Sequence, residues 1–169
     1  MNQVLTYLIA FLTMVTDAYG QKPVVFANQG LGIAFEATSQ WSRLQEADST
    51  VLELTNPNNN LSVRMWKESI VEDVDEYLDQ RLAAAGMAKL EGPFRLTIDS
   101  REAYGIIGLC NELHRPIKTF YIVIPSKSKS YIVQIKCPEE CYREHQKHID
   151  ELIRSIKLLS YKGFHSYLV

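Results

Sequence analysis

Residues 51–86, VLELTNPNNNLSVRMWKESIVEDVDEYLDQRLAAAG, contain the pattern that decides the fold. Apolar and polar residues alternate on both sides of NPNNN, residues 56–60, which predicts a β-hairpin because Pro presets φ and Asn tolerates left-handed backbone. From Ser69 the apolar spacing becomes helical. Ser69 and Glu72 form a capping-box pattern at the predicted start, and Gly86 is a natural C-terminal stop. A hairpin followed by an amphipathic helix indicates an α+β protein.

The rest of the chain repeats these two patterns. Alternation predicts further strands, and helical spacing returns near the end. A loop is expected at residues 111–117, and the polar loop PSKSKS, residues 125–130, is expected to join the strands on either side of it. Each helix has one apolar face, so we expect a mostly antiparallel sheet with helices packed on it, an α/β/α sandwich. The additional strands are predicted at 32–37, 94–98, 103–110, 120–124 and 131–135, and the second helix at about 138–159.

Composition indicates one globular domain. The chain has 169 residues, of which 46% are hydrophobic and 22% charged, which suits a single core. The formal net charge is −2, so bulk electrostatics give no reason to expect nucleic-acid binding.

The first twenty residues resemble a secretory signal peptide. They carry one charge, Asp17, and an apolar run over residues 4–15 that is short for a membrane span. We expect cleavage after Gly20, a single domain over 21–160 and a C-terminal tail over 161–169. An uncleaved anchor and a buried element of the fold are the alternatives. The mature protein is then expected to be exported, periplasmic or extracellular, with no transmembrane span.

The stretch KCPEECYREHQKH, residues 136–148, contains two cysteines and two histidines. Sulfur and imidazole are zinc ligands, so Cys141 and His145 are candidate metal ligands. However, the first and last donors of one helix, Cys137 and His148, would lie about 16 Å apart and could not surround one ion. We therefore expect Cys141 and His145 to face the core, and we expect no cofactor.

Three cysteines allow one intramolecular disulfide and leave one thiol over. Cys137 and Cys141 are the favoured pair, because the spacing suits one helical turn. A bridge from Cys110 is less favoured, since its strand is expected to be separated from that of Cys137 by a middle strand. Free thiols and metal binding remain open alternatives.

No motif for a nucleophile–base pair, a phosphate loop or a metalloprotease occurs in the chain. Four residues are candidates for a ligand or partner groove: Trp41, Trp66, His114 and Arg115. The alternative for the tryptophans is core packing, and for His114 and Arg115 an exposed turn.

The order of these elements resembles the Mog1/PsbP-like family. The resemblance rests on Gly32-Ile33-Ala34-Phe35, Trp41, the hairpin, the helix SIVEDVDEYLDQRL, Ala103-Tyr104-Gly105 at the start of a long meander, and the closing helix. It spans about residues 30–159 and implies an α/β/α sandwich that serves as a non-enzymatic binding or assembly module.

We therefore expect an exported, non-enzymatic module that docks on a protein or an envelope complex. The alternative is a metal-binding or thiol-redox protein that uses the cysteine–histidine stretch. A hydrolase with a dispersed site is a third hypothesis.

Overall fold

The computed structural model describes residues 24–37, 40–44, 50–58 and 60–159. Within them, a seven-stranded antiparallel sheet has the order β3-β4-β5-β9-β8-β7-β6, and a three-stranded sheet has the order β1-β2-β10. The strands are β1 Val24–Asn28, β2 Ile33–Ala37, β3 Ser42–Arg43, β4 Val51–Asn56, β5 Leu61–Glu68, β6 Ala88–Ile98, β7 Arg101–Glu112, β8 Arg115–Pro125, β9 Ser130–Pro138 and β10 Lys157–Leu158; the helices are α2 Val74–Ala84, η1 Glu139–Cys141 and α3 Tyr142–Ser155. The expected signal peptide and tail lie outside the described residues, so the domain limits stay predictions.

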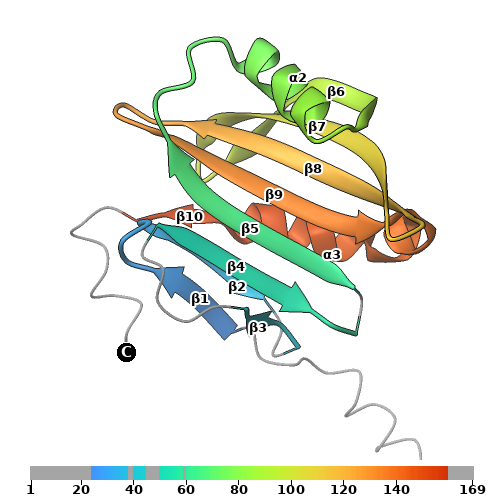
Figure 1. The fold of residues 1–169 in the computed structure, drawn as a ribbon. Coiled ribbons are helices and arrows are strands. Elements are labelled where there is room, and N and C mark those ends of the chain that lie inside the picture. Colours follow the sequence, from blue (N-terminus) through green and yellow to red (C-terminus); the bar gives the residue numbers. More distant parts are fainter. Residues whose placement is uncertain (1–23, 38–39, 45–49, 59, 160–169) are drawn as a thin grey trace, which may run out of the picture.

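The large sheet is covered on both faces. Helix α2 lies over one face, and α3 with the small sheet lies over the other (Figure 1). Leu78 and Leu82 of α2 pack on Ile106, Val123 and Ile132 of the sheet. The larger core on the opposite face joins alternate residues of β4, β5, β8 and β9 to β2 and α3: Leu52, Leu54, Val63, Met65, Ile122, Ile135, Ile33, Phe35, Ile149 and Leu152. The α+β class with helices on a mostly antiparallel sheet is confirmed.

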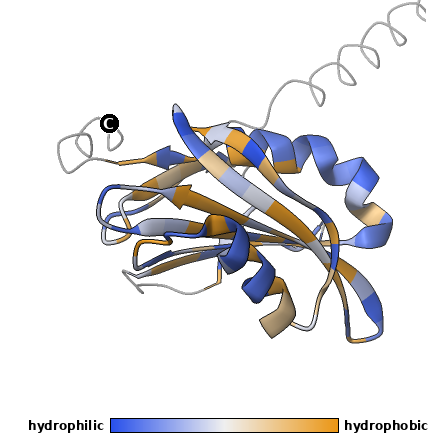
Figure 2. Cartoon of the chain, turned by 90° about the horizontal axis from the view of Figure 1, so that it is seen from above, coloured by the Kyte–Doolittle hydropathy of each residue, from blue (hydrophilic) through white to orange (hydrophobic). Residues whose placement is uncertain are grey.

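The hairpin of residues 51–66 is confirmed. Leu52 is opposite Met65 and Leu54 is opposite Val63, and all four side chains are buried. In Figure 2, apolar residues follow the strands while the outer surface of α3 is largely hydrophilic. This is the division expected of an amphipathic helix on a sheet.

The predicted start of the first helix is wrong by four residues, because the cap is Asp73 and not Ser69. Helix α2 begins at Val74, and its N-cap is Asp73, whose side chain accepts a hydrogen bond from the Glu76 backbone N–H at 3.0 Å. The pair Asp73–Glu76 has the same spacing as the pair Ser69–Glu72, and Asp is as strong a cap as Ser. The sequence pattern therefore could not discriminate between the two starts. The segment before Asp73 is not helical. It is held to the start of β9 by a hydrogen bond from the Val71 N–H to the Ser130 hydroxyl, at 3.0 Å.

Two other boundaries are also corrected. The predicted loop at 111–117 is a tight hairpin: Glu112 pairs with Arg115, and the two turn residues, Leu113 and His114, have positive φ. The last helix is shorter than predicted, because Ile156 adopts an extended conformation and residues 157–158 pair with β2.

Two glycines of β7 permit close packing. A Cβ at Gly105 would lie 2.6 Å from the Phe94 ring, and one at Gly108 would lie 2.5 Å from Leu82. Gly108 therefore lets α2 approach the sheet, because a larger residue would collide with the helix side chain.

Candidate functional site

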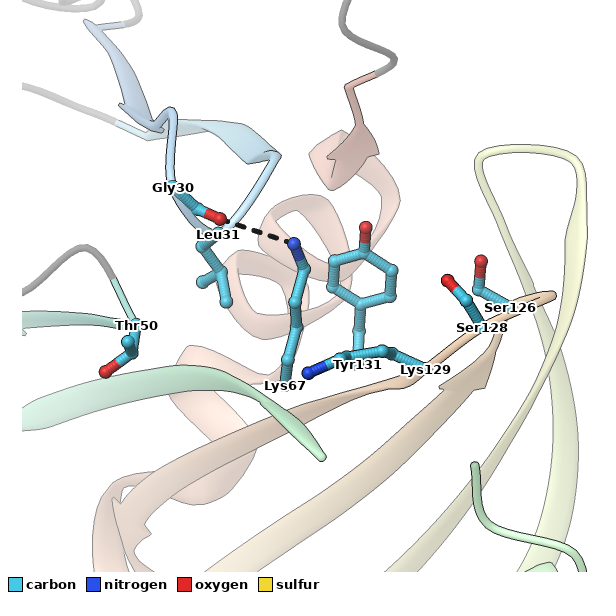
Figure 3. A pocket seen from close by; sticks show the side chains of 8 residues that line it. All are labelled: Gly30, Leu31, Thr50, Lys67, Ser126, Ser128, Lys129 and Tyr131. Carbon is cyan, nitrogen blue, oxygen red and sulfur yellow. Dashed lines mark hydrogen bonds between the residues drawn. The ribbon is translucent and has the colours of Figure 1, made fainter. Parts of the chain in front are cut away.

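A cavity of about 400 Å³ lies where the turn between β1 and β2 meets the end of the large sheet (Figure 3). We call it the basic pocket. It is built from the β1–β2 turn, the residue before β4, the end of β5, the β8–β9 loop and the start of β9. The described lining residues are Gly30, Leu31, Thr50, Lys67, Ser126, Ser128, Lys129 and Tyr131.

The pairing of β5 with β9 places the central side chains of the pocket. Lys67 lies directly opposite Tyr131 in this antiparallel pair. The Lys67 ammonium nitrogen is 5.2 Å from the centre of the Tyr131 ring, a cation–π distance. Both side chains are half-buried and extend toward the β1–β2 turn (Figure 3). The sheet therefore fixes this cation at one end of the molecule.

The β1–β2 turn forms the opposite wall. The Asn28 carboxamide oxygen accepts from the Leu31 N–H at 2.9 Å, and its amide nitrogen donates to the Val51 carbonyl at 3.1 Å. Asn28 thus ties the small sheet to β4. The turn presents the Gly30 carbonyl, which accepts from Lys67 Nζ at 3.3 Å.

Gly32 brings this turn close to the two central side chains. Its φ is +66°, and a Cβ there would lie 3.7 Å from both Lys67 Nζ and the Tyr131 hydroxyl oxygen. A side chain at this position would be strained and would reduce the space around the ammonium group.

The β8–β9 loop supplies the third wall. It carries the exposed Lys129 and the hydroxyls of Ser126 and Ser128. Arg101, the first residue of β7, donates to the Ser126 hydroxyl at 3.5 Å. The loop residues alternate between serine and lysine, so donors and positive charges are interleaved along it.

The pocket is electropositive. Two lysines and no carboxylate occur among its described lining residues. Burial lowers the pKa of Lys67, and the positive charge of Lys129 lowers it further. The two cations are close enough to repel each other, so an anion bound between them would relieve this repulsion. The lining can bind an oxyanion with ammonium and hydroxyl donors.

The three cysteines are free thiols in the structure. Cys137 is fully buried at the end of β9, and Cys141 is half-buried at the N-cap of α3. Burial raises the pKa of Cys137 to about 11, and the neighbouring Cys141 thiol contributes to this rise. The Cys137–Cys141 bridge is therefore not formed here, and its formation under oxidising conditions stays a prediction.

Cys110 lies apart from this pair. It is opposite Ile117 of β8, and β8 in turn pairs with β9, so a strand separates Cys110 from Cys137. The middle strand expected between them is confirmed.

Of the two candidate metal ligands, only His145 lies on the buried side of the last helix. His145 is 8% exposed and shares the buried face of α3 with Ile149 and Leu152, while His148 is exposed. Cys141, which was also expected to face the core, is only half-buried. The predicted burial of His145 is confirmed. Among residues 24–37, 40–44, 50–58 and 60–159, no three His, Cys, Asp or Glu side chains form a group that could hold a metal ion.

The structure does not bring the four groove candidates together. Trp41 packs against the core that contains α3, and Trp66 against the cluster under α2. Trp66 Nε1 donates to a Glu68 carboxylate oxygen at 2.7 Å, so its role there is structural. His114 and Arg115 are exposed at the β7–β8 turn.

Sequence reasoning missed the basic pocket. The sequence predicts only a polar loop for PSKSKS, residues 125–130, and Lys67 is one isolated charge at a strand end. Only the β5–β9 pairing and the distant β1–β2 turn bring these residues together. The alternation of serine and lysine was the one local signal available.

The chain has a Mog1/PsbP-like fold. It superposes on the Ran-binding protein Mog1p of Saccharomyces cerevisiae with a TM-score of 0.58 and 12% identity, over 85% of this chain and 98% of that one. The cyanobacterial PsbP protein (CyanoP) of Synechocystis gives 0.57 and 9%, over 83% and 94%. LpqN of Mycobacterium tuberculosis, described as involved in cell envelope biogenesis, gives 0.54 and 11%, over 82% and 91%.

These likenesses concern the fold alone, because identities near one residue in ten carry no site across. The sequence matches no protein-family model and no curated protein. In the described part of the chain, no helix is both long enough and apolar enough to cross a membrane.

Proposed function

We propose that this protein is an exported, non-enzymatic binding module that docks on a protein partner, and that the basic pocket receives an acidic group of that partner. The observation that carries the proposal is the pairing of Lys67 and Lys129 around one cavity with no carboxylate among its described lining residues. Charges of one sign in a recess favour a ligand of the opposite sign and speed its encounter.

The structural neighbours support a binding role. Mog1p is described as a Ran-binding protein and LpqN as a participant in cell envelope biogenesis. We further propose that the partner belongs to the cell envelope. The description of LpqN and the signal-like sequence at residues 1–20 support this.

Site-specific photocrosslinking in the native cell tests the proposal. A photoreactive phenylalanine analogue at Ser128, which lines the pocket, is expected to capture one defined protein. The adduct should disappear when Lys67 and Lys129 are both replaced by Met. The same analogue at Lys147, which is 85% exposed on α3, is the control and should not capture that protein. Identical adducts from both positions, or an adduct that persists without the two lysines, contradict the proposal.

A further inference from the structure

A second hollow adjoins the basic pocket. It has a volume of about 460 Å³ and is lined by Arg101, Pro125, Ser126 and Lys127. Ser126 lines both hollows, so the two adjoin at this residue of the β8–β9 loop. The second hollow adds two cations to the two already in the pocket, and no carboxylate occurs among its described lining residues.

We propose that the two hollows form one basic groove that binds an acidic peptide segment of the partner, with one carboxylate in the basic pocket and a second between Arg101 and Lys127. This proposal rests on the proposed function and specifies its ligand. Four cations in two adjoining hollows exceed what one carboxylate needs. A flexible segment with successive carboxylates matches them better.

Asp99, an acidic residue two positions before Arg101, is already engaged. Asp99 precedes Arg101 in the β6–β7 turn; its carboxylate accepts from the Leu158 N–H at 3.0 Å and lies 3.5 Å from Lys157 Nζ. Asp99 therefore balances Lys157 at the small sheet. Arg101 makes its hydrogen bond to a neutral hydroxyl and keeps its charge available to a ligand.

A peptide fits better than a nucleic acid. The whole chain carries a formal charge of −2, which gives no long-range attraction for a polyphosphate backbone. The four basic residues that line the two hollows lie at one end of the large sheet, where the groove accommodates a few side chains. Recognition is thus expected to depend on the number of carboxylates in a short segment.

Fluorescence anisotropy with two labelled peptides tests the inference on the purified chain. One probe is hexaglutamate, and the other is a hexapeptide with one Glu among glycines. Hexaglutamate is expected to bind about tenfold more tightly, the effect of one additional charge-assisted contact pair. In the double variant Arg101→Met/Lys127→Met, the affinity for hexaglutamate should fall to that for the single-Glu peptide. The affinity for the single-Glu peptide should not change. Lys67→Met should weaken both.

Two controls keep the result interpretable. Lys147→Met should alter neither affinity, and circular dichroism should show each variant folded. If the Arg101 substitution disturbs the loop, the single variant Lys127→Met replaces the double variant, because the Lys127 side chain is exposed. Equal affinity for both peptides, an equal effect of the double variant on both, or equally tight binding of an oligothymidylate overturns the inference. If Ser128 still captures a partner while the peptides fail, the inference alone is wrong. If the peptides bind while no partner is captured, the proposed function is wrong.

Discussion

Lys67 and Tyr131 face each other across the β5–β9 pair, with the lysine ammonium 5.2 Å from the centre of the tyrosine ring. The same ammonium donates to the Gly30 carbonyl of the small sheet at 3.3 Å. A single cross-strand pair therefore sets a cation at the junction of the two sheets. The position of this cation depends on strand register, because a slip of one residue would move the Lys67 side chain to the opposite face of the sheet.

Ligand binding should weaken with rising pH earlier than an ordinary lysine would allow. Only the ammonium form of Lys67 attracts a carboxylate, and its pKa lies below 10.5 because of burial and the Lys129 charge. Affinity for hexaglutamate should thus fall with a midpoint below pH 10.5. In Lys129→Met, this midpoint should move upward because the neighbouring charge is gone. Anisotropy titrations between pH 7 and pH 11 measure it, and an unmoved midpoint would rule out the coupling.

Glu68 should stabilise the attachment of α2 to the sheet. Its carboxylate accepts from Trp66 Nε1 at 2.7 Å, from the Tyr77 hydroxyl at 2.9 Å and from Arg81. Desolvation raises its pKa, but these three hydrogen bonds and the Arg81 charge outweigh it, so the net shift is downward. Glu68→Gln is expected to lower the free energy of unfolding by about 1–2 kcal/mol, reduced for partial exposure.

The sign of this shift fixes the pH dependence of stability. A carboxyl with a lowered folded-state pKa stabilises the protein above its unfolded value, here 4.5, and this stabilisation is lost as pH falls through the folded value. Wild type and Glu68→Gln should therefore converge in urea unfolding experiments below pH 4.5. The matched control is Glu102→Gln, whose pair with Arg95 is exposed and should contribute little. A constant difference at all pH values would refute this assignment.

Asp73 should act as the cap of α2, and Ser69 should not. Asp73→Ala removes the acceptor for the Glu76 N–H and is expected to lower the free energy of unfolding by about 1 kcal/mol. Ser69→Ala should change it by less than about half of that, since Ser69 lies four residues before the cap. Chemical denaturation of both variants decides between the two caps; a larger loss for Ser69→Ala would restore the capping box predicted from the sequence.

The thiols should differ in reactivity. Cys137 is fully buried and its pKa is raised to about 11, so little thiolate exists near neutral pH. Iodoacetamide should label the half-buried Cys141 well before Cys137 in the reduced, folded protein. Under oxidising conditions, peptide mapping should recover a Cys137–Cys141 linkage. Rapid labelling of Cys137 would contradict its burial, and a linkage that contains Cys110 would contradict the proposed pairing.

Local patterns predicted the elements of this fold but not their assembly into a site. Alternation on either side of residues 56–60 predicts the hairpin, and the helical spacing after it predicts α2. In both cases the spacing of apolar residues depends only on which face of that element is buried. The inward side of α3 followed from the same reasoning, and His145 is buried there.

Boundaries failed where two signals competed. Asp73 and Ser69 both precede an acidic residue by three positions, so spacing alone could not choose the cap. Leu113 and His114 carry no glycine or asparagine signal for a tight turn, although both adopt positive φ. The basic pocket could not be predicted, because Gly30, Lys67 and Lys129 are far apart in sequence and meet only through strand pairing.

Side-chain NMR of the lysines during titration with hexaglutamate tests the central claim most directly. The account predicts saturable shifts of the Lys67 and Lys129 ammonium resonances, with Lys147 on the outer surface of α3 unmoved. If Lys67 stays unperturbed, or if it moves no more than Lys147 does, the basic pocket is not a binding site and the account is contradicted.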